Sequence, residues 1–361
     1  MVKPAEIAEF SEKQGPELLD RTLRDIPVID GISFELESAI NGRRYDFLAE
    51  VRVGGRKYRL IGEVKRQVHP SQAREAALML KDYIRHADFD ATGVLVSDYL
   101  SPASRSICKE NGIGYLDLEG NVHLALDGVY LEREVSTKPK AERKKLKSLF
   151  KPKSARVLKK MLADPARIWR VAPLAEEAGV SLGHISNIRK SLLEREFART
   201  GKEGLFLCDP DRLLDTWQAE YTPPAGEYLE YYTTHHGRNL TDILIKTMKN
   251  IQGRPDMALA SFSAADWMAS YARYSKTMLY ADKKGLNRLA DSLDLKSSPS
   301  GANVDVVVLK DRDILDESTM QKGGVICTSP IQTYLDLASH GERGKEAADY
   351  LREKLMVRYP D

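Results

Sequence analysis

Residues 43–65, RRYDFLAEVRVGGRKYRLIGEVK, alternate in side-chain character on both sides of the pair Gly54-Gly55. A two-residue Gly-Gly loop favours a tight β-hairpin, because glycine adopts positive φ at both turn positions without a steric cost. The loop length fixes how the two strands pair, and Asp46 is predicted to lie opposite Glu63. Directly opposed Cβ atoms on neighbouring strands are about 4.5–5.5 Å apart, so the two carboxylates are expected side by side.

Side chains repeat every two residues along a strand, so the two faces of this hairpin are expected to differ. Asp46, Glu63 and Lys65 share one face. The other face is predicted to be the core side and carries Tyr45, Phe47, Ala49, Val51 and Val53 against Tyr58, Leu60, Gly62 and Val64. Neighbouring carboxylates repel, and bound Mg²⁺ or Mn²⁺ would relieve the repulsion. Together with a lysine, such a pair suits metal-assisted phosphodiester hydrolysis.

The order of these residues, Asp46 followed by Glu63-Val64-Lys65, resembles the PD-(D/E)XK, or restriction-endonuclease-like, superfamily. The resemblance covers roughly residues 10–130 of the chain. It implies a nuclease-like α/β fold in which Asp46 and Glu63 bind the metal ion and Lys65 assists catalysis.

Further polar residues accompany this set in the superfamily. Gln72, at the start of the next predicted helix, falls where some members place a polar residue, and an acid of the first helix, Glu17 or Asp20, is expected to complete the site. The alternative is a solvated sheet face on which Lys65 neutralises Glu63, because a fold does not imply an activity.

Strands alternate with amphipathic helices through the rest of the first predicted domain, residues 1–135. This pattern predicts a sheet covered by helices. The expected elements are helices within 5–25, at 71–86 and from 101, strands at 43–53, 56–65, 92–98 and 114–118, and a hairpin over Gly120-Asn121.

Residues 173–196, PLAEEAGVSLGHISNIRKSLLERE, predict two helices broken at Gly179. The positions of Ala175, Gly179, Ile185 and Ile188 resemble those of the helix-turn-helix DNA-binding family. A small residue lets the second helix pack closely on the first, and glycine permits the tight turn. The second helix is then the expected recognition helix, whose N-terminal part meets base edges.

Helical spacing divides this second helix into two faces. The inward stripe is predicted to be Leu182, Ile185, Ile188 and Leu192. The predicted DNA-binding face carries Ser181, His184, Asn187, Arg189 and Lys190, with Ser181 also the expected N-cap. Asparagine bonds adenine bidentately, and lysine reaches guanine or phosphate.

A wing is predicted at residues 196–209, where Arg199 and Lys202 are placed for DNA phosphates. With a preceding helix at 154–162, it completes a winged helix within a predicted domain of residues 154–217. The alternative use of such a unit is protein contact alone.

A basic segment, residues 136–153, separates these two predicted domains. Lys138 to Lys160 contains eleven Lys or Arg residues and one acid, a local net charge of +10 that leaves −8 for the rest of a +2 chain. Such asymmetry suggests contact with a polyanion, with a solvated linker helix as the alternative.

The remaining residues, 218–361, predict a C-terminal α/β domain. Its expected helices are 263–271, 286–293, 331–338 and 345–355, and its expected strands are 276–281, 303–309 and 324–328. Here SPIQTYLDLASHGERGKEAADYLRE (329–353) resembles the C-terminal part of the AbiEi-type antitoxin family, and GYLDLEGNVHL (114–124) fits its longer members. The resemblance implies a transcriptional regulator of a type IV toxin–antitoxin system, with a cognate toxin or another protein as a partner.

Composition narrows the class of protein. Apolar residues make up 42% and charged residues 30%, and no apolar run reaches membrane-spanning length, so a soluble protein without a membrane partner is expected. The N-terminus lacks the apolar core of a signal peptide. Cys108, Cys208 and Cys327 have no zinc spacing and are odd in number, which favours a reducing cytoplasm.

The expected fold class is therefore multidomain α/β, with a restriction-endonuclease-like domain, a central winged helix and a C-terminal α/β domain. Two functions compete: a regulator that binds double-stranded DNA as a homodimer, and a Mg²⁺-dependent DNA endonuclease targeted by the winged helix. A scaffold for a protein partner is a third, weaker reading.

Overall fold

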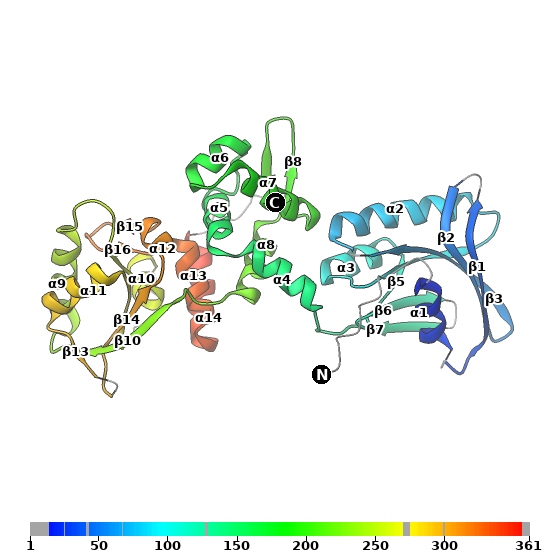
Figure 1. Cartoon of the computed structure of the whole chain (residues 1–361). Helices are drawn as coiled ribbons and strands as arrows, with labels where there is room; N and C mark the ends of the chain where they lie inside the picture. Colours follow the sequence, from blue (N-terminus) through cyan, green and yellow to red (C-terminus); the bar gives the residue numbers. More distant parts are fainter. Residues whose placement is uncertain are drawn as a thin grey trace, which may run out of the picture. The chain divides into compact units, whose positions relative to one another are not determined.

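A computed structural model of the chain describes residues 14–24, 26–40, 43–66, 68–126, 129–269, 275–298 and 300–355 (Figure 1). The start of the first predicted helix, before residue 14, lies outside the described residues. The chain divides into two compact units, one made of residues 1–145 and 190–198 and the other of 146–189 and 199–361. The predicted domain boundaries stay predictions.

The first unit is built on a seven-stranded sheet whose spatial order equals the chain order. Its strands are β1 (Ile29–Ile40), β2 (Arg43–Val53), β3 (Arg56–Lys65), β4 (Ala91–Ser97), β5 (Gly114–Asp117), β6 (Val122–Leu126) and β7 (Val129–Arg133). β3, β4 and β5 run parallel, and the other neighbours pair antiparallel. The carboxyl ends of the three parallel strands therefore meet at one edge of the sheet.

Helices cover both faces of this sheet (Figure 1). Helix α1 (Gln14–Leu23) packs its leucines against Phe47, Ala49, Val51 and Leu60. Helices α2 (Pro70–His86) and α3 (Pro102–Glu110) pack on the other face, against a core that contains Ile61 and Leu95. The parallel strands β4 and β5 are thus buried on both faces, as expected for parallel strands with covering helices.

The hairpin prediction is confirmed at its turn and corrected near its open end. Val53 pairs with Arg56, and Gly54 and Gly55 have φ of 53° and 79°. Tyr45 was predicted on the core face with Phe47, and this is wrong: its ring packs at 6.5 Å from that of Tyr83 on α2. The β2–β3 ladder ends at Phe47, so Tyr45 lies beyond the regular pairing that fixes the alternation.

The central part of the chain forms helices followed by a two-stranded hairpin. The elements are α4 (Lys140–Leu149), α5 (Pro152–Ala163), α6 (Val171–Ala178), α7 (Leu182–Glu194), β8 (Ala198–Thr200), β9 (Leu205–Leu207) and α8 (Pro210–Glu220). Gly179 ends α6 in the left-handed region, with φ 62° and ψ 42°, as the predicted turn requires. More than half of the basic segment, residues 136–153, lies in helix α4.

The second unit contains another seven-stranded sheet, of order β13-β10-β14-β12-β11-β16-β15. Its strands are β10 (Gly226–Tyr232), β11 (Met257–Leu259), β12 (Thr277–Ala281), β13 (Lys296–Ser297), β14 (Val304–Leu309), β15 (Thr319–Met320) and β16 (Ile326–Cys327). Its helices are α9 (Gly237–Lys249), α10 (Ser261–Met268), α11 (Lys283–Leu293), α12 (Asp313–Asp316), α13 (Pro330–Ala338) and α14 (Gly341–Leu355). Two sheets with their helices confirm the expected multidomain α/β class. Within the described ranges, no helix has the length and apolar character needed to cross a membrane.

Candidate functional site

The predicted acidic pair lies where β3 ends. The described ladder stops at the pair Phe47–Gly62, one step before Asp46 and Glu63. Asp46 instead accepts a hydrogen bond through Oδ2 from the backbone N–H of Val64, at 2.6 Å. This bond brings the Asp46 carboxylate beside the Glu63-Val64 peptide, in agreement with the hairpin register.

Lys65 and Glu63 form an ion pair, with Nζ 3.0 Å from Oε1. Glu63 is only 8% exposed, whereas Lys65 is half-buried. The two carboxylates offer hard oxygen ligands, and Mg²⁺ prefers one or two such groups together with water and phosphate oxygens. The side-chain chemistry of Asp46 and Glu63 therefore fits the predicted metal, which would polarise a phosphate and activate water there.

In the described part of the first helix, neither Glu17 nor Asp20 joins this set. α1 packs on the Phe47 and Val64 side of the sheet, opposite the Ile61 side that Glu63 shares by alternation. Glu17 is exposed, and Asp20 pairs with Arg24 on its own helix. No group of three or more His, Cys, Asp or Glu side chains suited to a metal occurs among the residues that the structure describes.

Gln72 lies in the first turn of α2, where its Oε1 accepts a hydrogen bond from the backbone N–H of His69 at 3.1 Å. This is a capping contact, since it satisfies an N–H that the helix itself leaves free. The predicted catalytic role of Gln72 stays a prediction.

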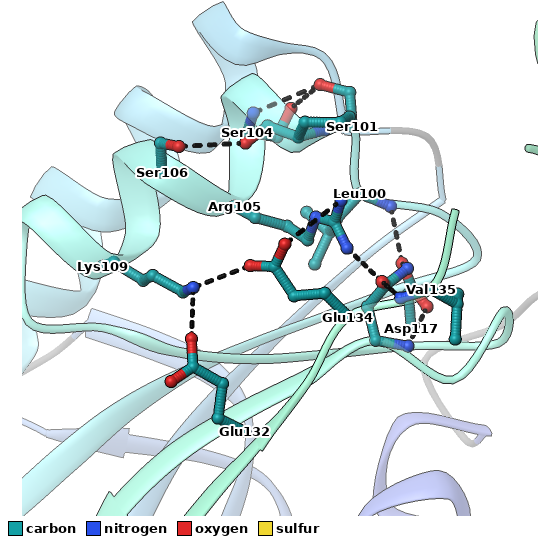
Figure 2. A network of polar contacts seen from close by, with 12 residues as sticks. Leu100, Ser101, Ser104, Arg105, Ser106, Lys109, Asp117, Glu132, Glu134 and Val135 are labelled. Carbon is teal, nitrogen blue, oxygen red and sulfur yellow. Dashed lines mark hydrogen bonds and ion pairs between the residues drawn. The ribbon is translucent and has the colours of Figure 1, made fainter. Parts of the chain in front are cut away.

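The carboxyl end of β5 carries a buried polar network that sequence analysis did not assign (Figure 2). Asp117, 2% exposed, accepts hydrogen bonds from the backbone N–H of Leu100 at 3.0 Å and of Asn121 at 2.9 Å. Burial raises the pKa of Asp117, while these hydrogen bonds lower it. The Asp117-to-Asn121 stretch of the GYLDLEGNVHL motif thus ties two loops together at the carboxyl edge of the parallel strands.

Arg105 of α3 extends the network toward β7 (Figure 2). Its guanidinium donates to the side-chain oxygen of Asn121, which also accepts from the backbone N–H of Val135 at 2.8 Å. Glu134 lies 3.7 Å from Arg105 and 2.7 Å from Lys109. These contacts fix the residues that follow β7, the last strand of the first sheet, against α3.

Residues 190–198, within the first unit, contact the start of α2. Arg74 donates to both carboxylate oxygens of Glu196 at 2.9 Å each, and Ser71 Oγ donates to the backbone carbonyl of Glu194 at 3.2 Å. Arg195, 6% exposed, lies 2.6 Å from Glu142 of α4. We call these contacts the α2 clamp. The sequence does not predict the α2 clamp, because Arg74 and Glu196 are 122 residues apart in the chain.

Burial also lowers the pKa of His69 to about 4, with smaller contributions from Arg195 and Lys145. His69 Nε2 lies 3.7 Å from the Glu194 carboxylate. The imidazole is therefore neutral at physiological pH in spite of this acidic neighbour.

The buried stripe of α7 matches the prediction except at its first residue. Ile185, Ile188 and Leu192 are at most 4% exposed, but Leu182 is 56% exposed and its inward assignment was wrong. Helical side chains lean toward the helix N-terminus. Because α7 begins at Leu182, that side chain leans past the first turn instead of onto the core. Ser181 Oγ accepts from the backbone N–H of His184 at 3.3 Å, which fits an N-cap.

The predicted DNA-binding residues differ in how freely they reach solvent. Ser181, Asn187, Lys190, Arg199 and Lys202 are exposed. Two others are half-buried and engaged: His184 Nε2 lies 3.2 Å from Ser154 Oγ, and Arg189 donates to Thr200 Oγ1 at 3.4 Å.

The basic segment presents most of its cations to solvent. The exposed ones in α4, α5 and the turn between them are Lys140, Arg143, Lys144, Lys145, Lys147, Lys151, Lys153 and Lys160. In contrast, Lys159 is 8% exposed and pairs with Glu317 at 2.7 Å. A row of exposed cations is the usual electrostatic footprint of nucleic-acid binding.

Residues 206–357 match the family model described as transcriptional regulator, AbiEi antitoxin, type IV TA system. This region is AbiEi-like. The match contains the segment 329–353 and confirms the predicted resemblance. No curated protein matches the chain in sequence.

Two solved structures are similar to about a third of the chain. One is a repair endonuclease from Pyrococcus abyssi, with 19% identity, a TM-score of 0.24, and coverage of 32% of this chain and 49% of that one. The other is an EndoMS–dsDNA2 complex, with 16% identity, a TM-score of 0.22, and coverage of 32% and 48%. The chain thus spans about half the length of each.

The AbiEi-like region contains a buried carboxyl that sequence analysis did not single out. Asp336 of α13 is 2% exposed and accepts hydrogen bonds from the Tyr221 hydroxyl and from Gln332 Nε2, the latter at 2.9 Å. Burial raises the pKa of Asp336 to about 6, against the lowering effect of its hydrogen bonds. Tyr221 follows α8, so this cluster connects α8 to α13.

Proposed function

We propose that this chain is a DNA-binding transcriptional regulator of the antitoxin type, which reads DNA through α7. The observation that carries the proposal is the α6–α7 pair. Gly179 provides a left-handed turn, Ile185 and Ile188 bury one side of α7, and Asn187 is exposed on another side. This is the arrangement that a recognition helix needs to enter a major groove.

The chemistry of the surrounding surface supports binding to double-stranded DNA. Asn187 suits adenine, and Lys190 suits guanine or phosphate. Arg199 and Lys202 are exposed in the β8–β9 hairpin, where the wing of a winged helix would contact phosphates. Phosphate contacts position a protein on DNA, whereas base contacts specify the sequence.

The AbiEi-like match at residues 206–357 supports the regulatory role, because that family is described as antitoxin regulators of type IV systems. A cognate toxin is then the proposed protein partner, and the cytoplasm the proposed location. Co-expression with the product of a neighbouring gene, followed by purification through one partner, tests the association.

Footprinting of the DNA upstream of the chain's own gene tests the regulator proposal. We expect a protected site, and we expect Asn187→Ala to weaken binding to that site by roughly tenfold or more, the value of one bidentate base contact. Asn250→Ala, the same change at an exposed asparagine outside α7, serves as the matched control. Absence of protection with wild-type protein would contradict the proposal.

We also propose that the regulator acts as a homodimer, because operator half-sites usually mirror a two-fold axis in the protein. Light scattering during size exclusion measures the mass, to be compared with 40.6 kDa for one chain. A monomer at working concentration, together with a footprint lacking two-fold symmetry, would argue against it.

The second candidate is a Mg²⁺-dependent DNA endonuclease, favoured by the contacts of Asp46, Glu63 and Lys65 at the end of β3. Asp46 and Glu63 would hold the metal, and Lys65 would stabilise negative charge on the phosphate. We expect wild-type protein with Mg²⁺ or Mn²⁺ to nick duplex DNA and Asp46→Asn to lose nicking but keep DNA binding. Calorimetry with each metal gives an independent readout. If wild-type protein binds neither metal and leaves DNA intact, the catalytic proposal fails and the regulator proposal is unaffected.

A further inference from the structure

An open hollow of about 460 Å³ lies between the starts of α5 and α7, in the second unit. Its lining includes Lys153 and Arg156 of α5, Ser181 before α7, and His184 in the first turn of α7. Ser181 and His184 lie on the predicted DNA-binding face of α7, whereas Lys153 and Arg156 have no individual predicted role. The structure brings these four polar side chains to one place.

Lys153 and Arg156 are the cations of the hollow. Lys153 is exposed and, in the described part of the chain, has no ion-pair partner. Arg156 donates to the carbonyl of Gly179 at 3.0 Å and lies 3.7 Å from Asp313, which holds its guanidinium beside the turn between α6 and α7. Glu176 of α6 is the acid in the lining. Since Asp313 offsets part of the charge of Arg156, the exposed Lys153 supplies most of the attraction for an anion.

His184 is held on the α5 side of the hollow. Its Nε2 lies 3.2 Å from Ser154 Oγ, and the ring is half-buried. A histidine bound in this way is fixed in orientation, which suits a positioned phosphate contact better than the free reach that a base edge requires. Asn187, one turn further along α7, is exposed, and among the described residues no such contact restrains it.

We propose that this hollow binds one phosphate of the DNA backbone, with Lys153 as its charge partner and Nδ1 of His184, the ring nitrogen that does not face Ser154, as the hydrogen-bond donor. The proposal rests on the regulator function and reassigns His184 from base reading to backbone binding. The hollow is open to solvent, as a phosphate within a continuous strand requires. Bound there, the phosphate would fix how deeply α7 enters the groove, since backbone contacts set register.

The salt dependence of DNA affinity tests the role of Lys153. Each neutralised phosphate contributes about 0.9 to the slope of log affinity against log salt. We expect Lys153→Gln to lower that slope by about one, so that its deficit against wild type shrinks about 3.5-fold between 50 and 200 mM salt. Lys284→Gln removes the same charge from an exposed position of α11, outside the hollow and outside the basic segment, and is the control. Glu176→Gln is expected to strengthen binding.

Sequence preference tests the role of His184. We expect His184→Gln to weaken binding to a preferred and to a scrambled duplex by the same factor, because a phosphate carries no sequence information. Single methylphosphonate substitutions in the duplex locate the phosphate: one position should weaken wild-type binding and leave Lys153→Gln unaffected. Thermal melting of each variant confirms that it is folded.

The outcomes separate this proposal from the function on which it rests. If wild-type protein binds no DNA, both are overturned. If it binds DNA but Lys153→Gln keeps the wild-type slope, or His184→Gln changes the preference between duplexes roughly tenfold as a base contact would, only the phosphate site is overturned. Binding of inorganic phosphate by DNA-free protein, with unchanged DNA slopes, would identify a free-anion site and overturn it as well.

Discussion

At the scale of single residues, Asp336 shows how burial sets the chemistry of a carboxyl group. Its pKa is raised from 3.8 to about 6, chiefly by burial. A raised pKa means that the fold favours the neutral acid. The stabilising contribution of the neutral carboxyl is therefore full below the unfolded pKa and is lost as the pH rises through the folded pKa.

We expect Asp336→Asn to gain stability relative to wild type as the pH rises from 4 to 7, by roughly 2 kcal/mol for a shift of this size. Urea unfolding of both proteins at several pH values measures the difference. Asp88→Asn, at an exposed aspartate, controls for general charge effects. A stability difference that stays constant over this range would show that Asp336 is ionised in the fold as it is in water.

Single residues were predictable where one hairpin or one helix determines their positions. Gly54-Gly55 set the register that brings Asp46 beside the Glu63-Val64 peptide, and helical spacing identified the buried Ile185 and Ile188. The contact between His184 and Ser154 was not predictable, because it depends on how α5 packs. Local periodicity carries no information about a partner thirty residues away.

At the scale of elements, β3 depends on a glycine at its centre. A Cβ at Gly62 would lie 2.0 Å from the ring of Phe47, which is fully buried on the neighbouring strand. The ring thus occupies the space that a side chain would need, and glycine is required for close packing rather than for an unusual φ.

We expect Gly62→Ala to destabilise the protein by about 1–3 kcal/mol, the usual cost of overpacking a core. Gly31→Ala on β1 is the matched control, because nothing lies within 4 Å of its added Cβ. Thermal unfolding of the two variants makes the comparison. Equal melting temperatures would mean that Phe47 moves aside at little cost.

The α2 clamp yields a prediction about local opening. Arg74→Ala removes the bidentate contact with Glu196, and we expect faster amide exchange in residues 190–198 with a global loss of only about 0.2–1 kcal/mol, because the pair is partly exposed. Arg85→Ala, at an exposed arginine of the same helix, should leave that exchange unchanged. Exchange rates that do not respond to Arg74→Ala would show that the segment is held by other contacts.

At the scale of the whole molecule, the sequence predicted the fold class and most helices and strands, but not every strand. β1 was missed because its apolar residues are interrupted by Asp30, Glu35 and Glu37, as is common on the edge of a sheet. β10, α9 and β11 were missed beside the Pro-bearing join, where the short strand β11 gives too few residues for a period. The hairpin of β2 and β3 alone also does not show which faces of the first sheet are buried, because that burial depends on how α1, α2 and α3 pack.

The division of the chain has a consequence for any attempt to take the protein apart. Residues 190–198 belong to the first unit, although they follow and precede segments of the second. Cutting the chain at residue 145 therefore cannot release two intact halves. The N-terminal product would lack residues 190–198, which belong to its unit. The C-terminal product would keep Arg195 and Glu196 without their ion-pair partners Glu142 and Arg74.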